Sequence, residues 1–167
     1  NLFMIKNKKM ELKKMDYKRI KKRKELLKKL IKNVMTELKV NKKLIDNVSI
    51  TFLSYRSIQL RIYNNNYNNT FNKLEINFNF YQFKEVIKEG VNDIYYKNRS
   101  KLINPIIKNN KKMAVRFIIA HEVAHVKNVS QDKKLIKNNK GFNTLQELKA
   151  DRIALDYLKN KGVKKNG

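Results

Sequence analysis

Apolar residues recur at helical spacing in the N-terminal part of the chain, and neither Pro nor Gly interrupts residues 8–40. This pattern predicts one long amphipathic helix, or two joined helices, with lysines on the solvent side. We favour a helix that packs on the rest of the protein over one that lies on a membrane surface, because its apolar stripe lacks bulky aromatic anchors. The stripe consists of Leu27, Leu30, Ile31, Val34 and Leu38, continued less regularly by Met15 and Ile20.

The middle of the chain changes to an alternation of apolar and polar residues, which is typical of half-buried strands. Residues 48–53, 58–63 and 74–80 show this alternation. The Asn-rich stretch of residues 64–73 separates the last two segments, so we predict a hairpin with a long loop there. These segments together predict a small antiparallel or mixed sheet.

The third strand is followed by a weaker helical pattern over residues 83–88. We expect this short helix to end at Gly90, because glycine is favoured just after the last turn of a helix. The next stretch, residues 91–112, is rich in Asn and Lys and contains Pro105, the only proline of the chain. We therefore expect it to be irregular.

Two helices are predicted to close the chain. Residues 112–126 are apolar nearly all round, which is typical of a central buried helix. Residues 144–160 carry their apolar positions on one broad side, and Asn143 or Thr144 is expected to cap the start of this helix.

Composition is consistent with one domain that has its own core, since the chain has 167 residues and 41% of them are apolar. The absence of cysteine excludes a disulfide framework, a thiolate metal site and a cysteine nucleophile. No apolar run approaches the ~18 residues of a membrane span, and the basic start lacks the apolar segment of a signal peptide. We expect a cytoplasmic protein without a membrane span.

Positive charge is concentrated near the N-terminal end. The chain has a formal net charge of +26, and residues 1–43 alone contain 17 basic and 4 acidic residues. Such a region attracts nucleic acid or another polyanion non-specifically at low salt. The alternative is codon bias in a low-GC bacterium or its phage, because Lys, Asn and Ile are abundant while only 7 of the 40 basic residues are Arg.

The predicted central helix contains the sequence His121-Glu122-Val123-Ala124-His125, which includes both histidines of the chain. Residues four apart lie on one face of a helix, so both imidazoles can bind one zinc ion. Glu122 would lie beside the ion, where a general base for a zinc-activated water belongs. The alternative is two buried histidines bonded to backbone carbonyls, but burying three such groups without partners would be costly.

A zinc site of this kind needs a third protein ligand, and without other His or Cys this ligand must be a carboxylate. We assign Glu147, on the next predicted helix, as that ligand. Asp132 follows the histidines too closely for the chain to turn back. Asp151, one helical turn after Glu147, is predicted to accept a ring N–H from a ligand histidine, the alternative being a plain surface acid. Arg152 and Tyr157 are weaker candidates for stabilising the oxyanion.

Two segments of this region, HEVAHVKN and ELKADRIALDYL, resemble the gluzincin metallopeptidases, in which a glutamate on a following helix completes the zinc site. They are most similar to the HtpX and CAAX-prenyl-protease group and also fit the small ImmA/IrrE-type peptidases. The resemblance covers residues 113–158. The chain lacks the transmembrane helices of the first group and has a basic N-terminus that the second lacks, while the SprT/Spartan proteases use a histidine as third ligand.

The resemblance implies an α+β minimal zincin with an N-terminal helical region, a small sheet, a metal helix and a ligand helix. We expect residues 1–43 to be a basic amphipathic helical region and residues 44–167 to be the metallopeptidase domain. The implied activity is a zinc-dependent endopeptidase that binds one Zn²⁺ and cleaves a protein or peptide substrate, with Glu122 as general base. The alternative is a nucleic-acid-associated basic protein whose zincin core is catalytically idle.

Overall fold

The computed structural model describes residues 2–53, 59–65, 70–131 and 143–163. Most of these residues are helical and three strands form one small sheet, so the fold is α+β, as predicted. In chain order, the elements are α1 (Leu2–Glu37), α2 (Lys42–Asp46), β1 (Val48–Leu53), β2 (Gln59–Asn65), β3 (Thr70–Asn79), α3 (Phe80–Glu89), α4 (Arg99–Ile107), α5 (Lys111–Gln131) and α6 (Thr144–Val163).

The sheet has the strand order β1-β3-β2, with β3 in the centre. β3 pairs with β1 in parallel and with β2 antiparallel, so the sheet is mixed. In the parallel pair Ile50 lies opposite Ile76 and Phe52 lies opposite Phe78. The rings of Phe52 and Phe78 stack with centroids 6.1 Å apart. These aligned apolar residues provide the face of the sheet that joins the core.

β2 and β3 form the predicted hairpin, but its loop is shorter than the predicted residues 64–73. β2 continues to Asn65 and β3 begins at Thr70, so much of the Asn-rich stretch is paired strand. Asparagine is disfavoured in strands, yet the ladder gives its backbone groups partners and outweighs this preference. A register shift between Tyr63 and Asn64 accommodates one extra residue in β3.

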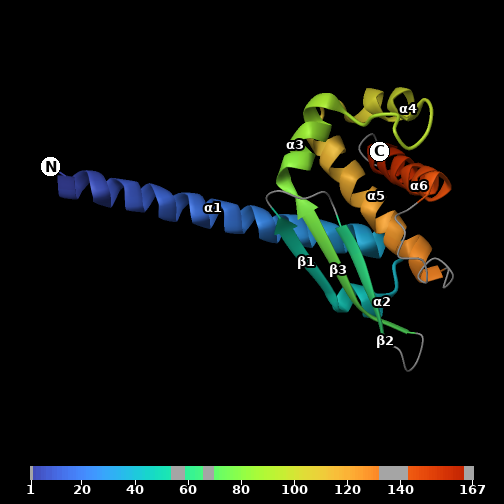
Figure 1. Cartoon of the computed structure of the whole chain (residues 1–167), viewed down its shortest axis with the longest axis horizontal. Coiled ribbons are helices and arrows are strands. Elements are labelled where there is room, and N and C mark those ends of the chain that lie inside the picture. Colours follow the sequence, from blue (N-terminus) through green and yellow to red (C-terminus); the bar gives the residue numbers. More distant parts are fainter. Residues whose placement is uncertain (1, 54–58, 66–69, 132–142, 164–167) are drawn as a thin grey trace.

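α1 is a single helix whose first part projects from the rest of the molecule (Figure 1). Its 36 residues correspond to about 54 Å at the ~1.5 Å rise of an α-helix. Every side chain of residues 17–23 is exposed, whereas Ile31, Val34 and Met35 are fully buried. The predicted packing of the helix therefore applies to its second half. We call residues 17–26 the basic arm.

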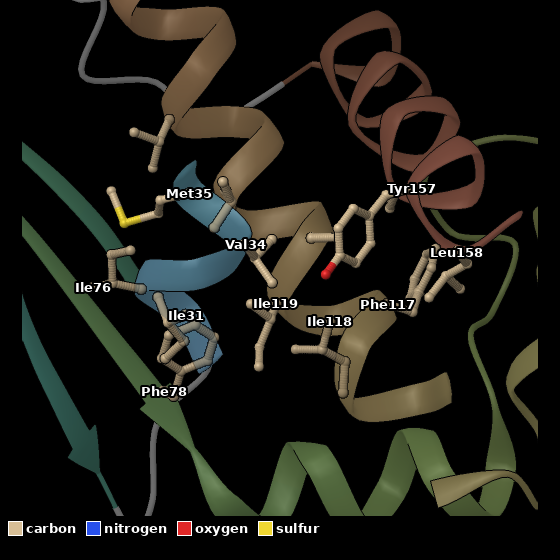
Figure 2. Packing of buried hydrophobic residues seen from close by; sticks show 14 of the residues in the cluster. Ile31, Val34, Met35, Ile76, Phe78, Phe117, Ile118, Ile119, Tyr157 and Leu158 are labelled. Atoms are coloured by element: carbon tan, nitrogen blue, oxygen red, sulfur yellow. The ribbon is translucent and has the colours of Figure 1, made fainter. Parts of the chain in front are cut away.

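The hydrophobic core lies where the second half of α1, the sheet, α5 and α6 meet (Figure 2). α5 is the central element and contacts α1, α3, α4 and α6. The apolar surface that the sequence predicts on several sides of this helix is thus covered by several neighbouring elements. Within the described part of the chain, no helix is both long and apolar enough to cross a membrane. The labelled residues of the core are Ile31, Val34, Met35, Ile76, Phe78, Phe117, Ile118, Ile119, Tyr157 and Leu158.

The segment between α3 and α5, which we expected to be irregular, contains the helix α4. Arg99, Ile103 and Ile107 lie four residues apart and are all buried, so α4 packs through one stripe. Pro105 removes one hydrogen bond from inside this helix. Both Pro105 and Lys101 are exposed, so the carbonyl of Lys101 that loses its partner can bond to water. The prediction was wrong because burial of the stripe outweighs the effect of the proline.

α3 ends at Gly90, as predicted, and residue 90 adopts a positive φ of 79°. The side chain of Asn104 in α4 lies against this turn and bonds both backbone groups of Val91. Asn104 Oδ1 accepts from Val91 N–H at 2.8 Å, and Asn104 Nδ2 donates to the Val91 carbonyl at 3.0 Å. A Cβ atom at residue 90 would lie 2.3 Å from Asn104 Oδ1. Glycine is therefore required here to attach α4 to the end of α3.

Candidate metal centre

His121 and His125 lie side by side on α5, because residues four apart share a helix face. Their ring centroids are 4.7 Å apart in an edge-to-face arrangement, and their Nε2 atoms are 3.2 Å apart. Only 8% of His121 and 2% of His125 is exposed. The two histidines therefore meet inside the protein with their Nε2 atoms converging.

α6 places Glu147 against both imidazoles. The helix begins with a reciprocal cap, in which Asn143 N–H donates to Gln146 Oε1 at 2.8 Å and Gln146 N–H donates to Asn143 Oδ1 at 3.0 Å. One residue later, the buried Glu147 has Oε2 at 3.2 Å from His121 Nε2 and Oε1 at 3.4 Å from His125 Nε2. The structure thus brings together the three residues that we assigned as ligands.

The three groups have the spacing of ligands around one small cation. The two Nε2 atoms are 3.2 Å apart, each lies 3.2 to 3.4 Å from its nearer Glu147 oxygen, and one ligand atom from each residue can be chosen so that all three lie within 4.8 Å of one another. Ligands bound tetrahedrally at ~2.0–2.1 Å would be about 3.3 Å apart. Among the described residues, no donor makes a well-formed hydrogen bond to the buried Glu147 Oε2. Two imidazoles and one carboxylate form a ligand set that zinc accepts. His121, His125 and Glu147 therefore fit a zinc ion with three protein ligands.

Glu122 lies beside this cluster. Its Oε1 is 3.9 Å from His121 Nε2, and 14% of its side chain is exposed. Burial raises the pKa of Glu122, while the neighbouring histidines oppose this effect. A carboxylate whose pKa is raised toward the working pH can accept a proton and later release it. The position and environment of Glu122 are thus those required of a general base.

Asp151 is completely buried, so it is not a surface acid. Its Oδ1 is 2.7 Å from His121 Nδ1. Burial disfavours the ionised carboxylate, but hydrogen bonds from His121 and Arg99 outweigh burial and lower the pKa of Asp151 to about 2. Because the ionised carboxylate can only accept, we assign the ring proton to His121 Nδ1. When the ring is neutral, His121 Nε2 then presents its lone pair to the cluster.

When no metal is bound, a proton stabilises the same arrangement. Burial disfavours the imidazolium of His121, but contacts with Asp151 and Glu147 raise its pKa to about 9. Burial also disfavours ionised Glu147, while contacts with His121 and His125 lower its pKa to about 2. A ligand histidine must be neutral, so a metal would displace this proton. The cluster is therefore an anionic site that requires a cation.

Tyr96 and Arg99 are residues of this centre that sequence reasoning missed. The Tyr96 hydroxyl donates to Asp151 Oδ2 at 2.7 Å, and Arg99 donates to both carboxylate oxygens, at 2.7 and 3.1 Å. Both residues come from the segment that we expected to be irregular, more than 50 residues before their partner. No motif marks them, and the only sequence signal is one arginine in a segment whose other basic residues are all lysines.

The other residues considered from the sequence do not complete the centre. Asp132 lies outside the described residues. Arg152 is exposed on α6. Tyr157 is buried, and burial together with a hydrogen bond to Glu37 at the end of α1 raises the pKa of its hydroxyl. That hydroxyl is engaged away from the two histidines, so neither oxyanion candidate is supported.

Comparison of the chain with protein-family models, with curated proteins and with solved structures finds no match. The resemblance of the two α5 and α6 segments to gluzincin peptidases, and the minimal zincin fold that it implies, therefore stay predictions. Function has to be inferred from the side chains of the centre. Their chemistry is a buried pair of imidazoles, a carboxylate in contact with both and a second carboxylate beside them.

Proposed function

We propose that the protein is a zinc-dependent metallopeptidase of the gluzincin type, with His121, His125 and Glu147 as metal ligands. The observation that carries this proposal is the convergence of three buried ligand groups, whose closest approaches to one another are 3.2 to 3.4 Å. The presence of Glu122 beside them distinguishes a hydrolytic centre from a purely structural one. A structural zinc site is normally closed by four protein ligands, whereas only three meet here among the described residues.

Each residue has one task in the proposed reaction. Bound zinc would polarise the scissile carbonyl and acidify a water molecule. Glu122 accepts the proton of the attacking water on its carboxylate and then returns that proton to the leaving amine. Asp151 holds the ring of His121 through Nδ1. The burial that raises the pKa of Glu122 makes its carboxylate a stronger acceptor for the proton of the water.

The sheet provides a means of holding an extended substrate. β3 is paired on both sides, whereas β1 and β2 each pair with only one strand among those described. The unpaired backbone groups of an edge strand can bind a peptide as an added strand. We therefore propose a protein or peptide substrate that is bound in an extended conformation.

The central test combines metal content with one isosteric variant. Elemental analysis of the purified protein should find one zinc per chain, and the parent should cleave an unstructured protein such as casein. Glu122→Gln should keep the zinc and lose about 10²–10⁴-fold in rate, because the amide cannot take the proton. Glu89→Gln, at the exposed end of α3, is the matched control and should retain full activity. Cleavage by Glu122→Gln at the parental rate would exclude Glu122 as the base.

A second function, nucleic-acid binding by the basic arm, is favoured by one observation. The residues of the arm's first two turns are exposed on every face of the helix, so basic side chains are accessible all round it. Like charges four residues apart repel one another, and a polyanion would relieve this repulsion. In the alternative that we retain, this binding is the main function and the metal centre is catalytically idle. The exposed basic residues are Lys18, Arg19, Lys21, Lys22 and Arg23.

Salt dependence tests this second function. Binding to duplex DNA should weaken steeply with salt, and substituting Lys18, Lys21 and Lys22 together by Gln should reduce the log–log slope by about 0.9 for each lysine that contacts a phosphate. The control replaces three exposed lysines elsewhere, Lys101, Lys108 and Lys111, and changes the net charge equally. Equal effects of both triple variants would mean that total charge, rather than the arm, determines binding. Binding only to anionic vesicles or acidic protein would refute the choice of nucleic acid.

A further inference from the structure

Asp151 is held by four hydrogen bonds from three side chains. Its Oδ1 accepts from His121 Nδ1 at 2.7 Å and from an Arg99 terminal nitrogen at 3.1 Å. Its Oδ2 accepts from Arg99 Nε and from the Tyr96 hydroxyl, both at 2.7 Å. Both oxygens are fully engaged, so Asp151 is not available as a metal ligand. The carboxylate can neither rotate nor shift without breaking several of these bonds.

Arg99 is itself buried to an unusual degree for an arginine. Only 8% of its side chain is exposed, and its guanidinium lies over the ring of Tyr95, 5.0 Å from the centroid. Burying an ion pair gives little net stability compared with apolar packing. A bidentate arginine and a phenol directed at one carboxylate do, however, fix the orientation of that carboxylate. The arrangement thus fixes the orientation of the Asp151 carboxylate and adds little to the net stability of the fold.

The backbone that carries these two residues is anchored at both ends. At the start of α4, Asp93 Oδ1 accepts from Ser100 N–H at 2.6 Å, a carboxylate at a helix N-terminus. Near the other end, Asn104 bonds both backbone groups of Val91. α4 also packs on α5. The donors are therefore held against the helix that carries His121.

We propose that Tyr96 and Arg99 are positioning residues of the metal centre, which act through Asp151 to hold His121 with Nε2 directed at His125 and Glu147. The imidazole ring can rotate about its Cβ–Cγ bond, and the Nδ1–H bond to Asp151 opposes this rotation. Asp151 can oppose it only if its own carboxylate is fixed. This inference rests on the proposed zinc function, and its test separates the two.

Two variants keep the charge of the centre unchanged, so that any effect on zinc comes from position. Tyr96→Phe removes one donor, and Arg99→Lys keeps the cation but loses the bidentate geometry. Loss of such outer partners typically weakens metal binding ~10–100-fold. We expect zinc affinity, measured by chelator competition, to fall at least tenfold in each variant. Tyr95→Phe keeps the ring below Arg99 and should bind zinc like the parent.

A second readout needs no metal. In the zinc-free protein, the His121 Nδ1–H proton should be visible by NMR and should exchange with solvent at least tenfold faster in Tyr96→Phe and Arg99→Lys than in Tyr95→Phe. A general loss of stability would instead speed exchange of the buried backbone amides of α5 equally. Unchanged exchange at His121 would overturn the proposal. If the parent protein binds no zinc but exchange at His121 is still faster in the two variants, the positioning role is supported and the metallopeptidase is refuted.

Discussion

Replacing Glu147 and Asp151 in turn distinguishes the metal ligand from the residue that only holds a ligand in place. The Glu147 carboxylate is in contact with both His121 Nε2 and His125 Nε2, whereas Asp151 is saturated by its own donors. Glu147→Gln should therefore weaken zinc binding more than Asp151→Asn does. Both changes keep the shape of the side chain and remove one negative charge, so they form a matched pair.

The expected magnitude follows from the number of ligands. Structural zinc sites with four ligands bind with about 10–16 kcal/mol, or about 2.5–4 kcal/mol for each ligand. Since about 1.4 kcal/mol corresponds to a factor of ten, loss of the Glu147 carboxylate should cost about 10²–10³-fold in affinity. Loss of the Asp151 charge, one step from the metal, should cost ~10–100-fold.

The assay is competition with a chelator of known affinity, accompanied by thermal unfolding of the zinc-free variants. Asp151→Asn weakens the partner of the buried Arg99 and should lower the unfolding temperature, which must be measured so that unfolding is not mistaken for weak binding. If Asp151→Asn loses more zinc affinity than Glu147→Gln while remaining folded, the third ligand has been assigned wrongly. Equal small losses in both variants would mean that the metal lies elsewhere.

Three further outcomes are expected. His121→Ala or His125→Ala should leave no stoichiometric zinc after dialysis, since each removes one of three protein ligands; zinc that persists by elemental analysis would contradict this. Gly90→Ala should lower the free energy of unfolding by at least ~1–2 kcal/mol, because residue 90 has a positive φ and its Cβ would meet Asn104, and an unchanged unfolding temperature would refute that reasoning. Deletion of residues 1–24 should leave a soluble folded protein. Deletion of residues 1–43 removes buried core residues and should expose apolar surface that binds a hydrophobic dye. Equal dye binding by the two truncated proteins would contradict the conclusion that only the second half of α1 packs in the core.

Local patterns were sufficient to predict most of the elements. The alternation in residues 48–53 and the helical patterns of α5 and α6 depend on neighbours in sequence, and the structure confirms them. The parallel pairing of β1 with β3 was not predictable, because alternation indicates which face is buried but not which strand is adjacent. α4 was missed because its buried stripe is short and because the helix contains Pro105.

The residues of the candidate centre likewise fall into those that a local pattern predicts and those that depend on tertiary contacts. His121, Glu122 and His125 follow from spacing within one helix. Glu147 follows from the lack of other ligands in the sequence, and Asp151 from its place one helical turn after Glu147. Tyr96 and Arg99 depend on how α4 docks against α5 and α6, which is a tertiary contact without a local signature. Outer residues of a metal centre are in general harder to predict than ligands, since hydrogen bonding to a carboxylate demands no fixed spacing in the sequence.

The metal centre is negatively charged whereas the whole chain is positively charged, and the positive charge of the chain need not affect the affinity of the centre for a metal ion. Glu122, Glu147 and Asp151 surround the histidines and Arg99 compensates one of them, so the ionised centre with neutral imidazoles has a local charge of −2. One Zn²⁺ would neutralise it, although the whole chain carries +26. The basic arm projects away from α5 and α6 (Figure 1), and exposed charges beyond ~10 Å are largely screened at physiological salt. Zinc affinity should therefore depend on the buried carboxylates and on Arg99, and neutralising the arm should leave it unchanged.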